Sequence, residues 1–307
     1  MTAAGEAVYL GVDVGATKIA FGLVTPDGRL LAADRVESRA RDAADLWSRL
    51  EAGVRTLVQR HGQAPTGVGI GSAGPIDLGA GTVSPVNIPV WRDFPLVASL
   101  ASAVGTDHVR MRGDAIAFAH AEHRFGAGRG ADDMLGLVVS TGVGGGLVLG
   151  GRVVTGHSGN AGYFGHTVIL ADGDACACGR RGCVEAYASG PQMVRRARSA
   201  GWPGPADADF ILLAEAARTG DAQAQRSIGE GAHALAVAIV NVLATLDIRR
   251  VVVGGGVSSA GAVYWERLQR HLERECEPIG FLRDVQVLPA QLGGEAGILG
   301  AALAVMA

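Results

Sequence analysis

The feature that most restricts the fold of this chain is a set of three short apolar strands joined by glycine turns, which occurs twice. The first set is predicted at residues 8–12, 19–24 and 29–33, with a Gly-Ala-Thr-Lys turn at 15–18. Glycine is abundant, with 47 in 307 residues, and it gathers at such turns. A β-meander therefore opens the chain.

The same order returns in the middle of the chain. Strands are predicted at 135–139, 146–149 and 152–154, with a Thr-Gly-Val-Gly-Gly turn at 141–145. Such self-similarity predicts an internal duplication. The remaining elements follow each meander: helices at 42–59, 191–199, 209–218 and 221–246, and strands at 66–70, 109–112, 250–253 and 284–288.

These elements predict an α/β protein with two mixed sheets flanked by helices. The length favours two lobes rather than one. We expect a small N-terminal α/β lobe at 1–125 and a large lobe at 126–293, separated at the glycine-rich break Gly126 to Gly130. The final helix, 294–307, is expected to pack back on the first lobe.

Charge and hydropathy limit the partners. The net charge of −3 provides no broad basic field for nucleic acid or an anionic membrane. The start of the chain lacks a secretory pattern, and the apolar stretch 232–246 is short for a membrane span, so we expect a cytoplasmic protein with no membrane segment. The expected partners are small molecules and copies of itself, as a dimer or tetramer.

The first glycine turn follows Asp13. Backbone N–H groups at Gly15 and Thr17 are candidates to cradle phosphate, with Lys18 adding positive charge and Asp13 holding Mg²⁺ through water. The spacing is not that of a Walker A loop, and an ordinary hairpin turn is an equal alternative.

Two further glycine clusters match a nucleotide site. The turn of the second meander offers Thr141, Gly142 and Gly144 for phosphate. A buried strand at 251–253 opens into glycines that include Gly255 and Gly256, where adenine or ribose could approach the backbone. The alternative for this last cluster is a plain strand-to-helix turn.

One histidine and three cysteines lie within eighteen positions: His166, Cys176, Cys178 and Cys183. In a chain without expected disulfides, three thiolates and one imidazole predict a closed tetrahedral Zn²⁺ site, which is structural because no ligand position stays open. Ordinary surface cysteines are the alternative. The fourth cysteine, Cys276, is isolated.

Together with the Gly-Asn-Ala-Gly-Tyr-Phe-Gly-His segment at 159–166 and the segment at 182–190, these motifs resemble the ROK family of bacterial sugar kinases and repressors along nearly the whole chain. The resemblance is closest to the glucokinase-like members. It implies a two-lobed, actin-like fold, a duplicated ribonuclease H-like ATPase, with ATP and sugar bound between the lobes and the sugar phosphorylated at its 6-hydroxyl.

The resemblance also implies site residues. The aspartate of the family's Glu-Asn-Asp-Ala segment matches Asp114, the expected base. From the residues alone, Asp114 reads first as the N-cap of a helix starting at Ala115. Matching sugar contacts are Gly74, Asn87, His166 and Glu185, where Asn87 could equally be a turn residue and Glu185 a solvated one.

Two departures from the family pattern concern the sugar. Gly113 stands where relatives have the Asn before the base, and Tyr163 stands where they have Glu before Gly-His. Both lost groups would normally hydrogen-bond hydroxyls of glucose, and a site without them binds plain glucose less well. We therefore expect a modified hexose such as 3-amino-3-deoxyglucose (kanosamine), with plain glucose or a C7 cyclitol as alternatives.

Two non-enzyme classes stay open at this point. A ROK-type repressor would carry a helix-turn-helix domain ahead of the shared core, and no such pattern precedes the first strand here. A sugar-binding protein without turnover is suggested by the two departures, but Asp114 and both phosphate turns remain. The sequence favours a kinase.

Overall fold

The computed structural model describes residues 7–306 and divides the chain into two compact units. Unit 1 contains the residues up to Gly130, Gly146–Gly162 and the residues from Gln291 onward; unit 2 contains Ala131–Gly145 and Tyr163–Ala290. The expected lobe at 126–293 was therefore wrong at three places. Residues 126–130, 146–162 and 291–293 belong to unit 1, and within the second of these segments β10 packs against α3 of that unit.

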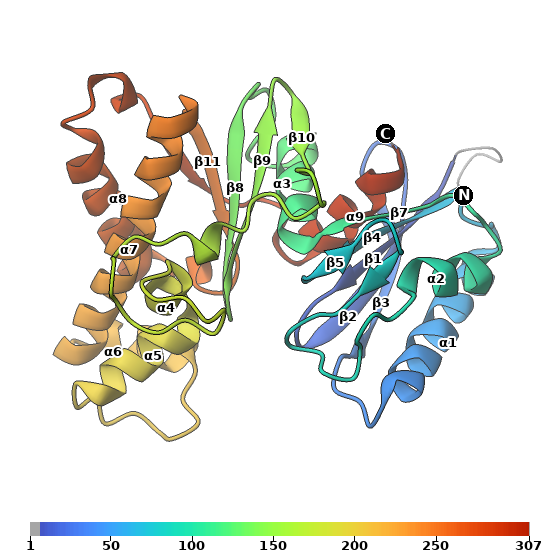
Figure 1. The fold of residues 1–307 in the computed structure, drawn as a ribbon, viewed down its shortest axis with the longest axis horizontal. Helices are drawn as coiled ribbons and strands as arrows, with labels where there is room; N and C mark the ends of the chain where they lie inside the picture. Colours follow the sequence, from blue (N-terminus) through green and yellow to red (C-terminus); the bar gives the residue numbers. More distant parts are fainter. Residues whose placement is uncertain (1–6, 307) are drawn as a thin grey trace. The chain divides into compact units, whose positions relative to one another are not determined.

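Unit 1 is built on a five-stranded sheet in the order β3-β2-β1-β4-β7 (Figure 1). The strands are β1 Tyr9–Val14, β2 Lys18–Val24, β3 Leu30–Glu37, β4 Gly67–Ser72 and β7 Val109–Gly113. The first three pair antiparallel, whereas β1, β4 and β7 run parallel. The carboxyl ends of the three parallel strands therefore meet at one edge, where α/β sheets usually bind ligands.

The second sheet has the order β10-β9-β8-β11-β12. Its strands are β8 Met134–Val139, β9 Val143–Leu149, β10 Arg152–Val154, β11 Arg250–Gly254 and β12 Gln286–Pro289. In both sheets the first three strands lie in reverse sequence order, as β3-β2-β1 and as β10-β9-β8. Two later strands then continue the sheet in parallel, β4 and β7 in one and β11 and β12 in the other. This repeated order confirms the predicted duplication. The strand β9 begins earlier than expected, so Gly144 lies in the strand and not in the turn before it.

Helices cover both faces of the first sheet. Leu46 and Leu50 of α1 (Ala43–His61) and Leu100 of α2 (Leu96–Val104) share one buried cluster with the sheet. The opposite face packs against α3 (Asp114–Phe125) and α9 (Ala296–Met306). A Cβ at Gly69 of β4 would overlap the Ala301 carbonyl, so glycine lets α9 approach the strand closely. The short strands β5 (Ile76–Asp77) and β6 (Thr82–Val83) form a separate hairpin.

Unit 2 carries α4 Glu185–Ala188, α5 Gly190–Ser199, α6 Phe210–Arg218, α7 Ala222–Leu246 and α8 Ala262–Cys276. Aspartates begin two of these helices: Asp209 accepts the N–H of Leu212 at 3.0 Å, and Asp221 accepts the N–H of Ala224 at 2.8 Å. Such caps satisfy backbone donors that the helix itself leaves unpaired, which explains why α6 and α7 start where the sequence predicts.

Helix α7 matches the predicted helix at 221–246 within one residue and therefore extends beyond the apolar stretch at 232–246. Among the described residues it is the one helix whose length and apolar composition would suffice to cross a membrane, although 56% of its most apolar window is buried inside the protein. It packs against α8, α6 and α5. Core helices pass the same test, so we interpret α7 as the core helix of unit 2.

Candidate active site and metal centre

Two carboxylates lie at the carboxyl edge of the parallel strands in unit 1. Asp13 is the penultimate residue of β1, and Asp114 directly follows β7. The helix α3 begins at Asp114 with Gly113 as its N-cap, so the expected N-cap position of Asp114 was off by one residue. The Oδ1 atom of Asp114 accepts the N–H of Ala115 at 2.7 Å, which ties the carboxylate to the first turn of the helix.

The surroundings of both carboxylates favour their protonated forms. Burial raises the pKa of Asp114 above its ordinary value. The pKa of Asp13 is raised to about 7, mainly by burial and also by the negative charge of Asp114, while the Lys18 ammonium opposes the increase. The two carboxylates are therefore close enough to interact. A base beside a cation-binding carboxylate is what phosphoryl transfer to a hydroxyl needs.

Asp13 also lies against the first turn of α9. A Cβ at Gly297 would overlap the Asp13 carboxylate, so only glycine fits there. The positive end of a helix dipole favours an anion at this place. The start of α9 thus becomes part of the wall of the site, which the sequence did not indicate.

The first glycine turn is a β-hairpin turn. The Gly15 N–H donates to the Lys18 carbonyl at 3.1 Å, and the Ser38 hydroxyl donates to the Gly15 carbonyl at 2.8 Å. Thr17 and Lys18 are exposed at its tip. The backbone therefore forms an ordinary hairpin turn, as the alternative interpretation had it. Because the tip is exposed, the side chains of Thr17 and Lys18 can reach a phosphate.

The structure brings together the two segments that hold the expected sugar contacts of unit 1. The Val86 N–H donates to the Gly74 carbonyl at 3.2 Å, which places the segments of Gly74 and Asn87 side by side. Asn87 is exposed within a turn in which the Ile88 N–H donates to the Pro85 carbonyl at 3.0 Å. The turn alternative for Asn87 is thus observed.

Gly113 leaves open space beside the base. A Cβ added there would come no closer than 3.7 Å to another heavy atom, the Cδ1 of Ile116. Its φ of −63° is an ordinary value that any residue adopts. The backbone would therefore accept a side chain at this position, and the gap next to Asp114 comes from the missing side chain alone.

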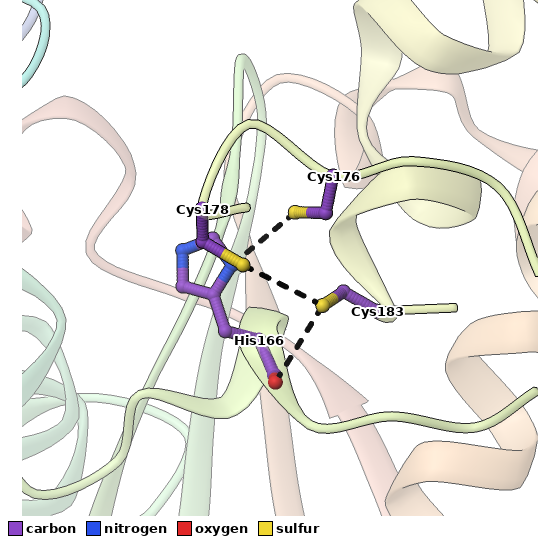
Figure 2. Close-up of side chains that lie close together, drawn as sticks. All are labelled: His166, Cys176, Cys178 and Cys183. Atoms are coloured by element: carbon purple, nitrogen blue, oxygen red, sulfur yellow. Dashed lines mark hydrogen bonds between the residues drawn. The ribbon is translucent and has the colours of Figure 1, made fainter. Parts of the chain in front are cut away.

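In unit 2, the four expected metal ligands converge (Figure 2). His166 ends the short helix η1 (Phe164–His166), and the three cysteines come from the loop that follows. One ligand atom of each residue lies within 4.8 Å of the others. The Sγ atoms of Cys178 and Cys183 are 3.7 Å apart, and Cys176 Sγ is 3.5 Å from His166 Nδ1.

These distances fit zinc. With Zn–S bonds of about 2.3 Å and Zn–N bonds of about 2.0 Å at tetrahedral angles, ligand sulfurs lie about 3.8 Å apart and sulfur and nitrogen about 3.6 Å apart. A disulfide would need sulfurs about 2.05 Å apart, and all three thiols are free. The Nδ1 atom of His166 faces the sulfurs, which leaves Nε2 on the far side of the ring. The exposed Tyr163 ring lies 4.8 Å from the His166 ring.

The second glycine turn, Ser140 to Gly142, is held by Glu185. The Val143 N–H donates to Glu185 Oε2 at 2.9 Å, and a Cβ at Gly142 would lie only 2.6 Å from the same oxygen. The Gly190 N–H adds a bond of 2.9 Å to the Ser140 carbonyl. Glu185 is therefore not simply solvated: its carboxylate bonds to the backbone beside the predicted phosphate turn.

The third glycine cluster meets the second turn. Gly255 has a φ of +92°, and a Cβ there would overlap the Val139 carbonyl. Glycine is therefore required at this position for two independent reasons. The Val257 N–H donates to the same carbonyl at 3.0 Å. The two glycine clusters that the sequence predicted at 141–145 and 254–256 thus lie beside each other.

A cavity of about 960 Å³ opens next to these turns within unit 2. Thr141 and Gly256 line it as predicted, whereas Gly142, Gly144 and Gly255 are not among its lining residues. Most of its lining residues were not predicted from the sequence. They come from α5 and α6: Gly190, Pro191, Val194, Arg195, Arg198, Phe210, Ala214 and Arg218. The Gly-Pro start of α5 and its run of arginines were the available signals.

Comparison with known proteins shows which family has this architecture. The ROK family matches residues 9–307. The glucokinase of Thermotoga maritima is 36% identical over 95% of both chains. The N-acetylmannosamine kinase of Escherichia coli O157:H7 is 37% identical over 96% of this chain and 97% of that protein. A crystal structure of a ROK family glucokinase from Streptomyces griseus in complex with glucose and AMPPNP is 36% identical, with a TM-score of 0.85 over 98% and 100% of the two chains.

The duplicated sheets and the paired glycine turns are those of a sugar kinase with the actin-like ATPase fold. The chain belongs to the ROK family.

Proposed function

We propose that this ROK-type sugar kinase transfers the γ-phosphoryl group of ATP to the 6-hydroxyl of a hexose, with Asp114 as the base. The observation that carries the proposal is the pair of half-buried carboxylates at the carboxyl edge of β1, β4 and β7. The Ala115 N–H donates to Oδ1 of Asp114, and in this proposal the Asp114 carboxylate accepts the hydroxyl proton as the oxygen attacks phosphorus.

ATP as the donor rests on two supports. The cavity beside Thr141 and Gly256 combines apolar walls from Val194 and Phe210 with arginines, as a purine nucleotide requires. The related Streptomyces griseus glucokinase is described in complex with AMPPNP, an ATP analogue. In this proposal Asp13 holds Mg²⁺ through water and Lys18 contacts phosphate; the ion neutralises phosphate charge.

The zinc site would shape the sugar pocket. With Nδ1 of His166 turned toward the thiols, Nε2 is the nitrogen available for a sugar hydroxyl. A bound Zn²⁺ would fix the orientation of this ring. Its role is structural in this proposal, because the donor set Cys₃His already fills a tetrahedral shell.

For the sugar itself we propose a modified glucose such as 3-amino-3-deoxyglucose. The open space at Gly113 and the exposed Tyr163 side chain replace an amide and a carboxylate of the glucokinase pattern. Plain glucose, N-acetylmannosamine and a C7 cyclitol are the competing substrates, the second because of the related kinases.

The test is an ATP-coupled assay of the purified protein against glucose, mannose, N-acetylmannosamine, glucosamine, kanosamine and a C7 cyclitol. We expect kcat/KM to be highest for kanosamine. The variant Gly113→Asn, which the backbone accommodates, should move the preference back toward glucose. Highest turnover of glucose by the unaltered protein would contradict the modified sugar, and the absence of turnover with every sugar would favour a binding protein.

A further inference from the structure

Glu122, near the end of α3, is a buried carboxylate with an exposed fraction of 0%. No ion pair involves it within residues 7–306. Burying an anion without a cation is costly unless hydrogen bonds compensate its charge. The partners of Glu122 therefore indicate why the chain keeps it.

Every one of those partners is a backbone N–H group. Oε2 accepts the N–H of Ala127 at 2.9 Å, and Oε1 accepts the N–H groups of Gln291 at 3.0 Å and Leu292 at 2.9 Å; the Gln291 N–H also lies 3.2 Å from Oε2. A Cβ at Gly126 would overlap the carboxylate. We call the hydrogen bonds of these three N–H groups the Glu122 clasp. It joins two loop segments that are far apart in the sequence.

The two segments are chain crossings between the units. The chain first leaves unit 1 after Gly130, three residues beyond Ala127, and it makes its last return from unit 2 at Gln291; between these points it re-enters unit 1 at Gly146–Gly162. The first exit and the last return are thus fastened to one side chain at the end of α3. Loops this close to a boundary would otherwise be free to change direction.

The clasp also joins the two helices that form the site in unit 1. The helix α3 begins with Asp114, and α9 begins four residues after Leu292, with its Gly297 against the Asp13 carboxylate. The two helices pack along each other (Figure 1). A carboxylate that ties the end of one helix to the start of the other sets how far each can slide.

We propose that Glu122 is a positioning residue for phosphoryl transfer, which holds α3 and α9 in the register that places Asp114 and Asp13 together. The inference rests on the proposed kinase function. Small errors in the position of a base cost large factors in rate, whereas the nucleotide cavity lies within unit 2 and does not touch the clasp.

The variant Glu122→Gln tests this, because it keeps the size of the side chain and replaces one acceptor oxygen by an NH₂ group that cannot accept. Glu266→Gln, at an exposed position of α8, is the matched control. We expect Glu122→Gln to lower kcat about tenfold and to leave the KM for ATP within about twofold, because positioning acts on the reacting geometry. The control should behave like the unaltered protein.

Hydrogen exchange gives the readout that does not depend on turnover. In the unaltered protein, the amides of Ala127, Gln291 and Leu292 should be protected although they lie in loops, and Glu122→Gln should speed their exchange about tenfold, as expected for the loss of hydrogen bonds to a charged group. Unprotected amides in the unaltered protein would contradict the clasp.

Faster exchange with an unchanged kcat would reduce Glu122 to a structural tie and overturn the positioning role. If Glu122→Gln does not fold, Glu122→Asp keeps the charge but is too short to reach both segments, and the same two results are expected of it. A protein that phosphorylates no sugar would refute the proposed function, and the protection of the three amides would still report on the clasp.

Discussion

The carboxyl edges of the two sheets occupy equivalent places in the duplicated fold, yet they carry different chemistry. In unit 1, Asp13 lies next to the last residue of β1, Asp114 directly follows β7, and the hairpin tip is exposed. In unit 2, β8 and β11 end in glycine clusters that contact each other, and a cavity opens beside them. One edge supplies carboxylates, and the other supplies close backbone approach and space.

Topology therefore determines where a ligand can bind in each unit, but not which chemistry is performed on it. Parallel strands bring their carboxyl ends together in both units. The chemistry then depends on which side chains follow the strands: carboxylates for proton transfer and cation binding, or glycines for a nucleotide.

Asp114→Asn should remove the proposed base of unit 1 while leaving the carboxyl edges of both sheets in place. We expect kcat to fall about 10³-fold, within the range for loss of a general base. Sugar affinity, measured by calorimetry, should change little. Asp107→Asn, at an exposed position before β7, is the control. Turnover close to that of the unaltered protein would show that Asp114 is not the base.

Cys178→Ser should act through unit 2. Loss of one of four ligands should release zinc, measured as metal per chain by mass spectrometry, and raise the KM for the sugar about 30-fold through misplacement of His166. Cys276→Ala removes the cysteine that lies outside the cluster and should keep the metal. A chain that never contains zinc, or a sugar KM unaffected by its removal, would refute this role.

Variants of Glu185 distinguish effects on ATP binding from effects on sugar binding. Glu185→Leu leaves the Val143 N–H without its acceptor and should loosen the second glycine turn, which would raise the KM for ATP about tenfold. Glu185→Gln retains an acceptor oxygen and should have a smaller effect on this KM. If both variants raise the KM for the sugar by the same factor and leave the KM for ATP unchanged, the Glu185 carboxylate binds the sugar and does not stabilise the turn.

The raised pKa of Asp114 predicts a pH dependence of stability. Because the folded protein holds this proton more tightly than the unfolded chain, stability falls as the pH rises from the unfolded pKa to the folded pKa. Asp114→Asn lacks this loss, so its Tm should exceed that of the unaltered protein by about 2 °C at neutral pH and by less near pH 4. The measurement is a thermal melt at both pH values. A constant difference would argue against the raised pKa.

Most of the fold could be predicted from local patterns. The strands of both meanders and the helices that begin after Asp42, Asp209 and Asp221 follow from alternation, glycine turns and N-caps, all of which are short-range signals. The helices α2 and α8 were missed, as were the hairpin of β5 and β6 and the return of residues 146–162 to unit 1. These depend on contacts that a local pattern does not encode.

The same distinction between local signals and distant contacts applies to the residues of the candidate site. The four metal ligands could be predicted because their donor types and spacing are themselves the signal, and the structure brings them within reach of one ion. Glu122 and Gly297 could not, because each matters through a partner far away in the sequence: the N–H of Gln291 for one, and the Asp13 carboxylate for the other.

By itself, then, the sequence determined the duplicated α/β plan, the glycine turns and the Cys₃His donor set, because each is encoded within a few neighbouring residues. The tertiary structure alone decided that Asp13 and Asp114 share one electrostatic environment, that Glu185 bonds to the second turn, and that Glu122 ties two crossings together. Burial and charge interactions arise only when distant segments meet, and they set the pKa values and positions on which the chemistry depends.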